Sequence, residues 1–91
     1  MPQFIRAAGY KIFFWSNESG EPIHFHVTKG EPSNNDTKIW LLKNGSLKVA
    51  HNKSRIPEKD LSKIFSVMQL CYFEFIDFWK SYFAGEVKFY E

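Results

Sequence analysis

Cysteine is nearly absent from the sequence, and Cys71 is the single one among 91 residues. One thiol excludes an internal disulfide and a metal centre built from several cysteines. Long apolar runs are missing as well, since no stretch approaches the roughly 18 apolar residues that span a membrane. The first residues, MPQFIRAAGYK, lack the apolar segment of a signal peptide. We therefore expect a cytoplasmic protein with no membrane partner.

The sequence also lacks an excess of charge of one sign. Twelve lysines and arginines stand against ten aspartates and glutamates, so the formal net charge is +2. This value does not by itself predict nucleic-acid binding. A basic cluster between positions 38 and 63 would suit RNA if its lysines lie over aromatics such as Trp15 or Trp40, although an ordinary solvated surface is the interpretation that we favour. The cluster consists of Lys38, Lys43, Lys48, Lys53, Arg55, Lys59 and Lys63.

Aromatic residues, in contrast, are abundant: ten Phe, four Tyr and three Trp make up 19% of the chain. A chain of this length forms one domain and buries only about 60–65% of the surface that it exposes when unfolded. More rings than the core can hold would leave an apolar patch, and such patches mark interfaces. We therefore expect a protein partner, or a second copy of the chain, on the aromatic surface of a C-terminal helix.

The pattern along the chain divides the single domain, residues 1–91, into a β-rich half (1–52), a helix (57–84) and a tail or edge strand (86–91). Alternation over YKIFFWS (10–16) and IHFHVTK (23–29) predicts two strands. QFIR (3–6) is a candidate for a short strand before them, with Gly9 in a positive-φ turn. In the first strand Ile12 and Phe14 share one side, and Phe13 and Trp15 share the other.

A second hairpin is predicted over residues 37–51. Asn44-Gly45 is the preferred pair for a two-residue type I′ turn. This turn would place Leu42 opposite Leu47 and Trp40 opposite Val49, and residues directly opposite each other point to the same side of a sheet. We therefore expect a core-facing surface made of these four side chains, Trp40, Leu42, Leu47 and Val49.

The last third of the sequence predicts one long helix from about Pro57 to about Ala84. Proline suits the first turn of a helix, and Gly85 can end it in the left-handed conformation. Apolar residues recur inside it at helical spacing: Leu61, Ile64, Phe65, Met68, Tyr72, Phe75, Ile76, Trp79 and Phe83. The expected fold is α+β, a small antiparallel sheet of four to five strands packed against one long C-terminal helix.

The segment EPIHFHV (21–27) carries the candidate chemistry. On a strand, His24 and His26 point to the same side, where they could bind one metal ion or act as general acid and base near neutral pH. The alternative interpretation is two histidines on the wet side of a half-buried strand, hydrogen-bonded to nearby carboxylates. A metal site would need a third ligand, and the candidates are Glu18, Glu21, Asp36 and His51.

We expect no cofactor, and a divalent metal on His24 and His26 is the less favoured alternative. In a hydrolytic enzyme of the ribonuclease type these two histidines would exchange protons, while Glu18 or Glu21 would orient them. Lys38 would then stabilise developing negative charge. Cys71 has no base at a motif spacing and is expected to be a packed, inert thiol.

The stretch GYKIFFWSNESGEPIHFHV, followed by KIWL and by IPEKDLSKI, resembles domain of unknown function family 4160, a family of small bacterial proteins. The resemblance runs from about Met1 to Phe83. The residues on its pattern are Asn17, Glu18, Glu21, Pro22, His24, His26, Val27, Lys38, Trp40 and Leu41. The hairpin sequence KNGSLKVAHNKSR and the tail GEVKFYE depart from it.

The resemblance implies association rather than a defined chemistry, because genes of this family look similar to two-gene toxin–antitoxin modules. The favoured expectation is therefore an interaction component of such a module. The metal-free hydrolase and a metal-binding domain are its alternatives, and the sequence leaves open whether the protein is an enzyme.

Overall fold

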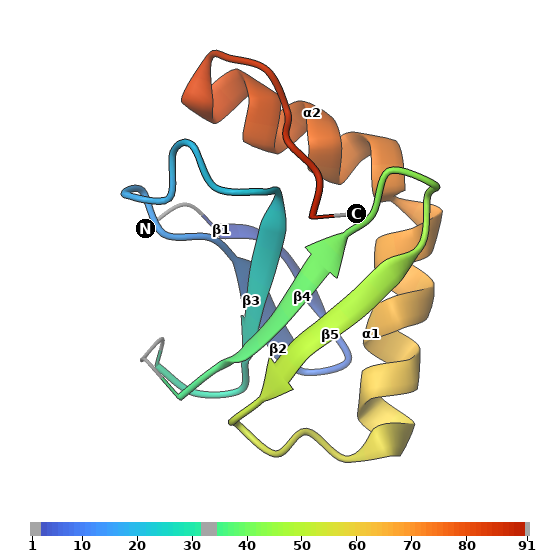
Figure 1. The fold of residues 1–91 in the computed structure, drawn as a ribbon. Helices are drawn as coiled ribbons and strands as arrows, with labels where there is room; N and C mark the ends of the chain where they lie inside the picture. The colour runs from blue at the N-terminus through green and yellow to red at the C-terminus, as the bar shows by residue number, and fades with distance from the viewer. Residues whose placement is uncertain (1–2, 32–34, 91) are drawn as a thin grey trace.

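The first half of the chain forms a five-stranded antiparallel sheet whose strands are neighbours in the order of the sequence (Figure 1). The structure, a computed structural model, describes residues 3–31 and 35–90. The strands are β1 (Gln3–Ala7), β2 (Tyr10–Phe13), β3 (His24–Thr28), β4 (Thr37–Leu41) and β5 (Leu47–Asn52). The predicted α+β class and the antiparallel sheet are confirmed. The strand expected over residues 10–16 is shorter and ends at Phe13.

The helical half contains two helices instead of the single one predicted. They are α1 (Glu58–Leu70) and α2 (Tyr72–Phe83), and Cys71 between them leaves the helical conformation (φ −102°, ψ 22°). Figure 1 shows α1 beside the sheet and α2 turned across its upper end. Neither proline nor glycine stands at the break. Tertiary contacts hold the new direction, because the Tyr72 hydroxyl donates to the Leu42 carbonyl and Phe75 packs on Phe25.

The core lies between the helices and one face of the sheet. Ile12 is opposite Val27, and Phe25 is opposite Ile39, so these residues share the helix-facing side. All four are fully buried. Burial of large apolar side chains in this layer is the main stabilising contribution that the sequence pattern predicts.

The hairpin between β4 and β5 has a register one residue away from the prediction. Its loop has three residues: Leu42 donates its N–H to Ser46 and accepts one from Gly45, and Gly45 alone in the loop takes a positive φ, 92°. A two-residue turn with two positive φ values does occur, but at Ala8-Gly9 between β1 and β2. The extra residue in the second loop shifts the pairing of β4 by one position.

This shift reverses the predicted orientation of β4. Leu41 is opposite Leu47 and Ile39 is opposite Val49, so Ile39 and Leu41 lie on the core side and are fully buried. Trp40 points to the other face and is only half-buried. A one-residue change of register moves every side chain of a strand to the opposite face. The prediction was therefore wrong for β4 and correct for Leu47 and Val49 on β5.

A second irregularity lies further along β5. Ile39 is opposite Val49 but Lys38 is opposite His51, so Ala50 is an extra residue in β5. Such a bulge re-aims the side chain that follows it. Without it, alternation would point His51 toward the helices; with it, His51 shares the outer face with Lys38.

The tail after α2 is not the edge strand that we considered. Ala84 ends α2 in the left-handed conformation, and residues 85–90 have no regular secondary structure; Glu91 lies outside the described residues. Ile23 donates its N–H to the Lys88 carbonyl (2.8 Å). Figure 1 shows the tail returning from α2 toward the end of β4.

Candidate functional site

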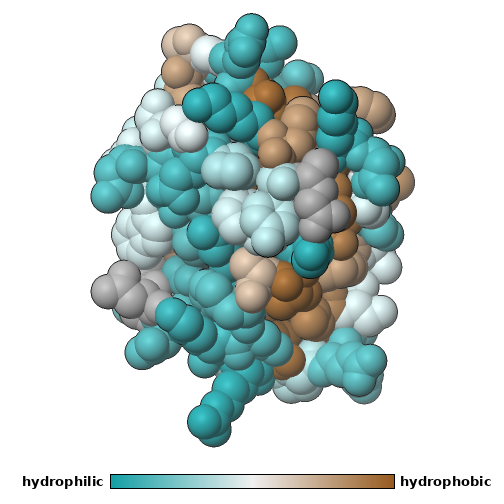
Figure 2. Space-filling view, in the orientation of Figure 1, coloured by the Kyte–Doolittle hydropathy of each residue, from teal (hydrophilic) through white to brown (hydrophobic). Residues whose placement is uncertain are grey.

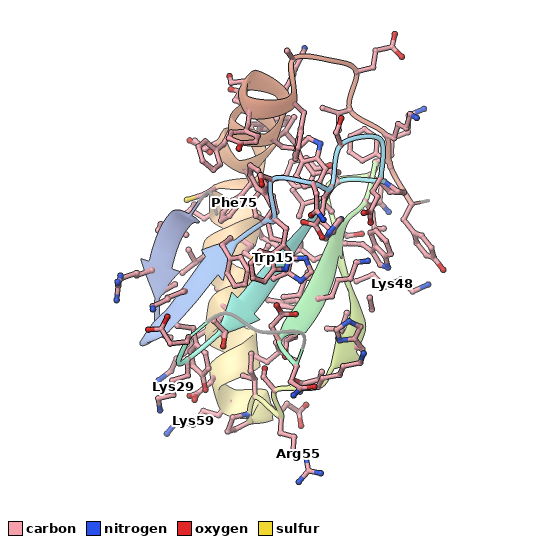
Figure 3. The ribbon with its side chains drawn as sticks, turned by 90° about the vertical axis from the view of Figure 1, so that its left-hand side faces the viewer. Trp15, Lys29, Lys48, Arg55, Lys59 and Phe75 are labelled. Carbon is pink, nitrogen blue, oxygen red and sulfur yellow. The ribbon has the colours of Figure 1, made fainter. Side chains whose placement is uncertain are left out.

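Strand β3 presents both histidines on the face of the sheet opposite Phe25, and the His24 ring also contacts Trp79 of α2, with centroids 5.3 Å apart. His24 is fully buried and His26 is 7% exposed. The wet strand face of the alternative interpretation is therefore wrong, but the hydrogen bonds to nearby carboxylates that it included are present. The loop after β2 covers the two histidines, since Trp15 lies close to the His26 ring and Glu18 lies against both rings. Figure 3 faces this side of the sheet, with Trp15 in front of the strands.

Glu18 is the centre of the buried polar network. Its Oε2 atom accepts hydrogen bonds from His24 Nε2 and His26 Nε2, each at 2.7 Å, and its Oε1 atom accepts one from the Trp15 backbone N–H at 2.7 Å. Burial alone would raise the pKa of Glu18, but the hydrogen bonds from the two histidines outweigh it and lower this pKa to about 2. The carboxylate is therefore ionised at neutral pH.

The partners of the two rings decide where their protons are. His24 Nδ1 lies 2.8 Å from the Pro22 carbonyl oxygen, and His26 Nδ1 lies 3.0 Å from Asp36 Oδ1. Carbonyl and carboxylate oxygens only accept, so both nitrogens of each ring must donate, which the imidazolium form does. Burial opposes charge on His26, but the carboxylates of Glu18 and Asp36 raise its pKa overall. The raised pKa favours the charged imidazolium form of His26 between these two acidic side chains.

This arrangement occupies all four ring nitrogens of His24 and His26. While these contacts persist, neither ring has a nitrogen with which to exchange a proton with a substrate. His24 and His26 instead hold Glu18 and Asp36 in place across three segments of the chain. Acid–base chemistry in this part of the fold would therefore require groups beside these two residues.

A cleft of about 470 Å³ opens over this network. Its lining brings together four of the five predicted site residues, and the fifth, His24, lies beneath it. The lining residues are Trp15, Asn17, Glu18, Glu21, His26, Asp36, Lys38 and His51. Figure 2 shows that hydrophilic residues predominate on the side away from α1 and that hydrophobic ones gather toward α1.

One cross-strand row explains how the cleft forms. Phe13, His26, Lys38 and His51 are directly opposite one another on β2, β3, β4 and β5. Residues paired in this way share a face. The bulge at Ala50 completes the row, because it alone gives His51 this orientation. Lys38 Nζ lies 4.0 Å from Glu21 Oε1 at the rim.

Two atoms in the cleft are buried and have no hydrogen-bond partner among the described residues: Asp36 Oδ2 and His51 Nδ1. Asp36 is only 3% exposed, and its other oxygen binds His26. Burial and, after it, the charge of Lys53 lower the pKa of His51, so the neutral ring predominates at neutral pH. His26 and His51 therefore have pKa values displaced in opposite directions within one cleft.

Sequence reasoning named Asp36 and His51 only as additional metal ligands. It did not assign a chemical role to Asn17. The proximity of Asp36 to His26 depends on the path of the loop before β4, and that of His51 depends on a hairpin register and a bulge. The predicted two-residue turn, continued from Trp40 opposite Val49, also pairs Lys38 with His51, but on the core-facing side. The three-residue loop turns Lys38 to the outer face, and the bulge at Ala50 turns His51 with it.

Glu18, His24 and His26 also form a group of three potential metal ligands within 4.8 Å of one another. Tetrahedral zinc with bonds of about 2.0 Å separates its ligand atoms by about 3.3 Å. The Oε2–Nε2 distances of 2.7 Å are those of hydrogen bonds. This arrangement fits hydrogen bonding, and Glu18 would have to move away from both rings to make room for a metal ion.

Comparison with known proteins gives one match. The family model described as "Domain of unknown function (DUF4160)" matches residues 9–80. No curated protein and no solved structure matches the chain. None of the helices in residues 3–31 and 35–90 is long and apolar enough to cross a membrane. The match spans β2 to α2 and includes the whole cleft, and on this basis the chain belongs to the DUF4160 family.

Proposed function

We propose that the protein is a metal-free hydrolase of the ribonuclease type that cleaves single-stranded RNA in the cleft above the Glu18 network. The observation that carries this proposal is the pair of unpartnered buried atoms, Asp36 Oδ2 and His51 Nδ1. An unsatisfied buried polar atom costs about 1–3 kcal/mol. A polar ligand that binds in the cleft and draws these two side chains toward it would supply the missing partners.

The charges around His51 favour an anionic ligand. Lys38 and Lys53 are close enough to act on the pKa of His51, and both lower it. Lys38 also lines the cleft. A phosphodiester placed between Lys38 and His51 would meet a cation and a neutral base, which is the combination that cleavage next to a ribose hydroxyl requires.

The reaction uses the 2′-hydroxyl of RNA as nucleophile. His51 takes the 2′ proton, the 2′-oxygen forms a bond to the adjacent phosphorus, and the bond from phosphorus to the 5′-oxygen breaks. Water supplies a proton to the leaving 5′-oxygen. The products are a 2′,3′-cyclic phosphate and a 5′-hydroxyl. Lys38 stabilises the negative charge that builds up on the phosphoryl oxygens.

The buried network has a positioning role in this proposal. His26 holds Asp36 through Oδ1, and the buried Oδ2 is the atom left to accept a hydrogen bond when the cleft rearranges around the substrate. Glu18 fixes His26, and His24 fixes Glu18 from below. The predicted residues Glu18, His24 and His26 thus support the reaction without exchanging protons with the substrate.

The test is incubation of the purified chain with end-labelled single-stranded RNA in EDTA. We expect fragments with 2′,3′-cyclic phosphate ends and no cleavage of DNA of the same sequence. His51→Asn should reduce the rate about 100-fold, the usual contribution of a general base. Lys38→Ala should also reduce it, whereas Lys43→Ala removes the same charge from the exposed hairpin loop and should have no effect. Intact RNA with the wild-type chain, or equal rates for His51→Asn, would refute the proposal.

A second candidate function is supported by a different surface. Leu70 and Phe73 flank the break between α1 and α2 and are 85% and 74% exposed. Large exposed apolar side chains that lie close together in the sequence suit a protein interface. They support the interaction component of a two-gene, toxin–antitoxin-like module, in which a second protein covers this surface.

Co-expression with the product of the neighbouring gene tests this second candidate. We expect the two proteins to co-purify, and Leu70→Ser with Phe73→Ser to abolish co-purification. Lys59→Ser on α1 is the matched control. Light scattering that shows a monomer with no bound neighbour would count decisively against it.

A further inference from the structure

We infer that the ring of Trp40 is a nucleobase-stacking subsite beside the cleft, which the C-terminal residues 86–90 cover by placing Tyr90 on it. This inference rests on the proposed RNA substrate and names where a base adjacent to the cleaved bond would bind. It also assigns a function to the tail, which the cleft chemistry does not use.

The position of Trp40 follows from the corrected register. Trp40 is two residues from Lys38 on β4, so both point to the outer face of the sheet. It is directly opposite His24 on one side and Lys48 on the other. The His24 ring meets Trp40 edge-on, with centroids 5.3 Å apart, and fixes the indole from below.

Tyr90 covers Trp40 in the geometry of a stacked base. The two rings are 4.7 Å apart between centroids and nearly parallel, at 4°. Lys38 Nζ lies 4.3 Å from the Trp40 centroid, and Lys48 Nζ lies 5.3 Å from the Tyr90 centroid. Each of the two stacked rings thus has a lysine over it. A nucleobase with phosphates on either side would need the same environment, and stacking of this kind accepts any base. Figure 3 shows Lys48 on the same side of the sheet as Trp15.

The cover is a segment that can leave without unfolding the sheet. Residues 85–90 have no regular secondary structure, and Tyr90 is half exposed. The hydrogen bond from Ile23 to Lys88 holds the middle of the tail two residues before Tyr90. Tyr90 can therefore move away from Trp40 while that backbone contact stays in place.

Tyr90 and a nucleobase would occupy the same face of Trp40 and exclude each other. The tail then acts as a built-in competitor, and RNA must displace the phenol ring before it binds fully. Removing the ring should tighten RNA binding, because the free protein no longer has to open the site.

The experiment uses a fluorescein-labelled 2′-O-methyl oligoribonucleotide, which has no free 2′-hydroxyl and cannot be cleaved by the proposed route. Fluorescence anisotropy measures its affinity. We expect Tyr90→Ala to bind about fivefold more tightly than the wild type, since stacking of one base contributes about 1–3 kcal/mol. Tyr90→Phe keeps the stacked ring and should bind like the wild type. Adding Trp40→Leu to Tyr90→Ala should abolish the gain.

The half-exposed Tyr90 makes Tyr90→Ala the deciding variant, because this change should not impair folding. Unchanged or weaker binding by Tyr90→Ala would overturn the inference. The outcome is separable from that of the proposed reaction. Tighter binding by Tyr90→Ala without RNA cleavage would refute the ribonuclease and leave the stacking subsite, whereas cleavage with no effect of Tyr90→Ala would refute the subsite alone.

Discussion

The two faces of the central sheet are both buried, but by opposite means. On the helix side, Phe25 packs edge-on against Phe75 in an apolar layer. On the other side, His24 and His26 are covered by a loop and joined to Glu18 and Asp36. Every residue of β3 is buried as a result.

The two faces differ in how they tolerate the loss of a side chain. Apolar burial is additive in area and indifferent to pH, so truncating a side chain leaves a cavity. A buried charged network is stable only while all its members are paired, because one missing partner leaves uncompensated charge. The outer face therefore contributes less to the free energy of unfolding than the losses for single substitutions in it suggest. It is also the face that is more sensitive to the loss of one side chain.

The largest expected effect is that of Glu18→Ala. This change removes the acceptor shared by His24 and His26 and should reduce the free energy of unfolding by about 4 kcal/mol, as for breaking a buried ion pair. Glu21→Ala in the same loop is exposed and should change it by less than about 0.5 kcal/mol. Urea unfolding followed by circular dichroism measures both. Equal midpoints for the two variants would show that the network does not contribute.

Phe75→Ala is the corresponding test on the helix side. The lost ring should cost about 3 kcal/mol, within the usual range for a buried phenylalanine. Because no charge is involved, the loss should be the same at pH 5.5 and pH 8.5. Phe73→Ala, on the exposed side of α2, should be nearly neutral. A loss that varied strongly with pH would remove the distinction between the two faces.

The pH dependence of the wild type should come from the outer face. The pKa of Glu18 falls from 4.5 to about 2 on folding, so its contribution is present above pH 4.5 and is lost as pH falls toward 2. The pKa of His26 is raised above 6.5, so its contribution is present below pH 6.5 and is lost as pH rises through the folded value. The lowered pKa of His51 acts in the opposite direction near pH 6.5.

Maximal stability is therefore expected between about pH 4.5 and pH 6.5. Urea midpoints at pH 3, 5.5 and 9 should show the decrease on both sides. His51→Asn should steepen the decrease on the alkaline side, because the opposing titration is gone. A flat profile from pH 3 to pH 9 would contradict the charged assignment of the network.

The smallest expected effect concerns the turn that decides which residues reach each face. Gly45 has a φ of 92° with open space around it, so Gly45→Ala meets only backbone strain. We expect a loss of about 1 kcal/mol. Gly30→Ala, also in open space but without a positive φ, should change stability by less than about 0.5 kcal/mol. Thermal unfolding of the two variants makes the comparison, and equal midpoints would show that the loop tolerates a side chain there.

Local patterns were sufficient for much of the fold. Alternation in β3 correctly separated Phe25 from His24 and His26, because side-chain direction along a strand depends only on position. Antiparallel pairing of strands close in sequence and the helical stripe after Pro57 followed in the same way. The break at Cys71 could not be predicted, because the apolar spacing continues through it and long-range packing sets the direction of α2.

The candidate site likewise has a part that local patterns predicted and a part that long-range contacts decided. Its histidines, Glu18, Glu21 and Lys38 were identified because residue type and spacing suggested chemistry. Tertiary structure decided their contacts: Glu18 and Asp36 occupy the ring nitrogens of His26. The three-residue loop and the bulge at Ala50 bring Lys38 and His51 together on the same face. The sequence by itself determined which side chains share a strand face. Only the folded chain decided which strands and loops meet there, because register and burial depend on contacts between residues far apart in the sequence.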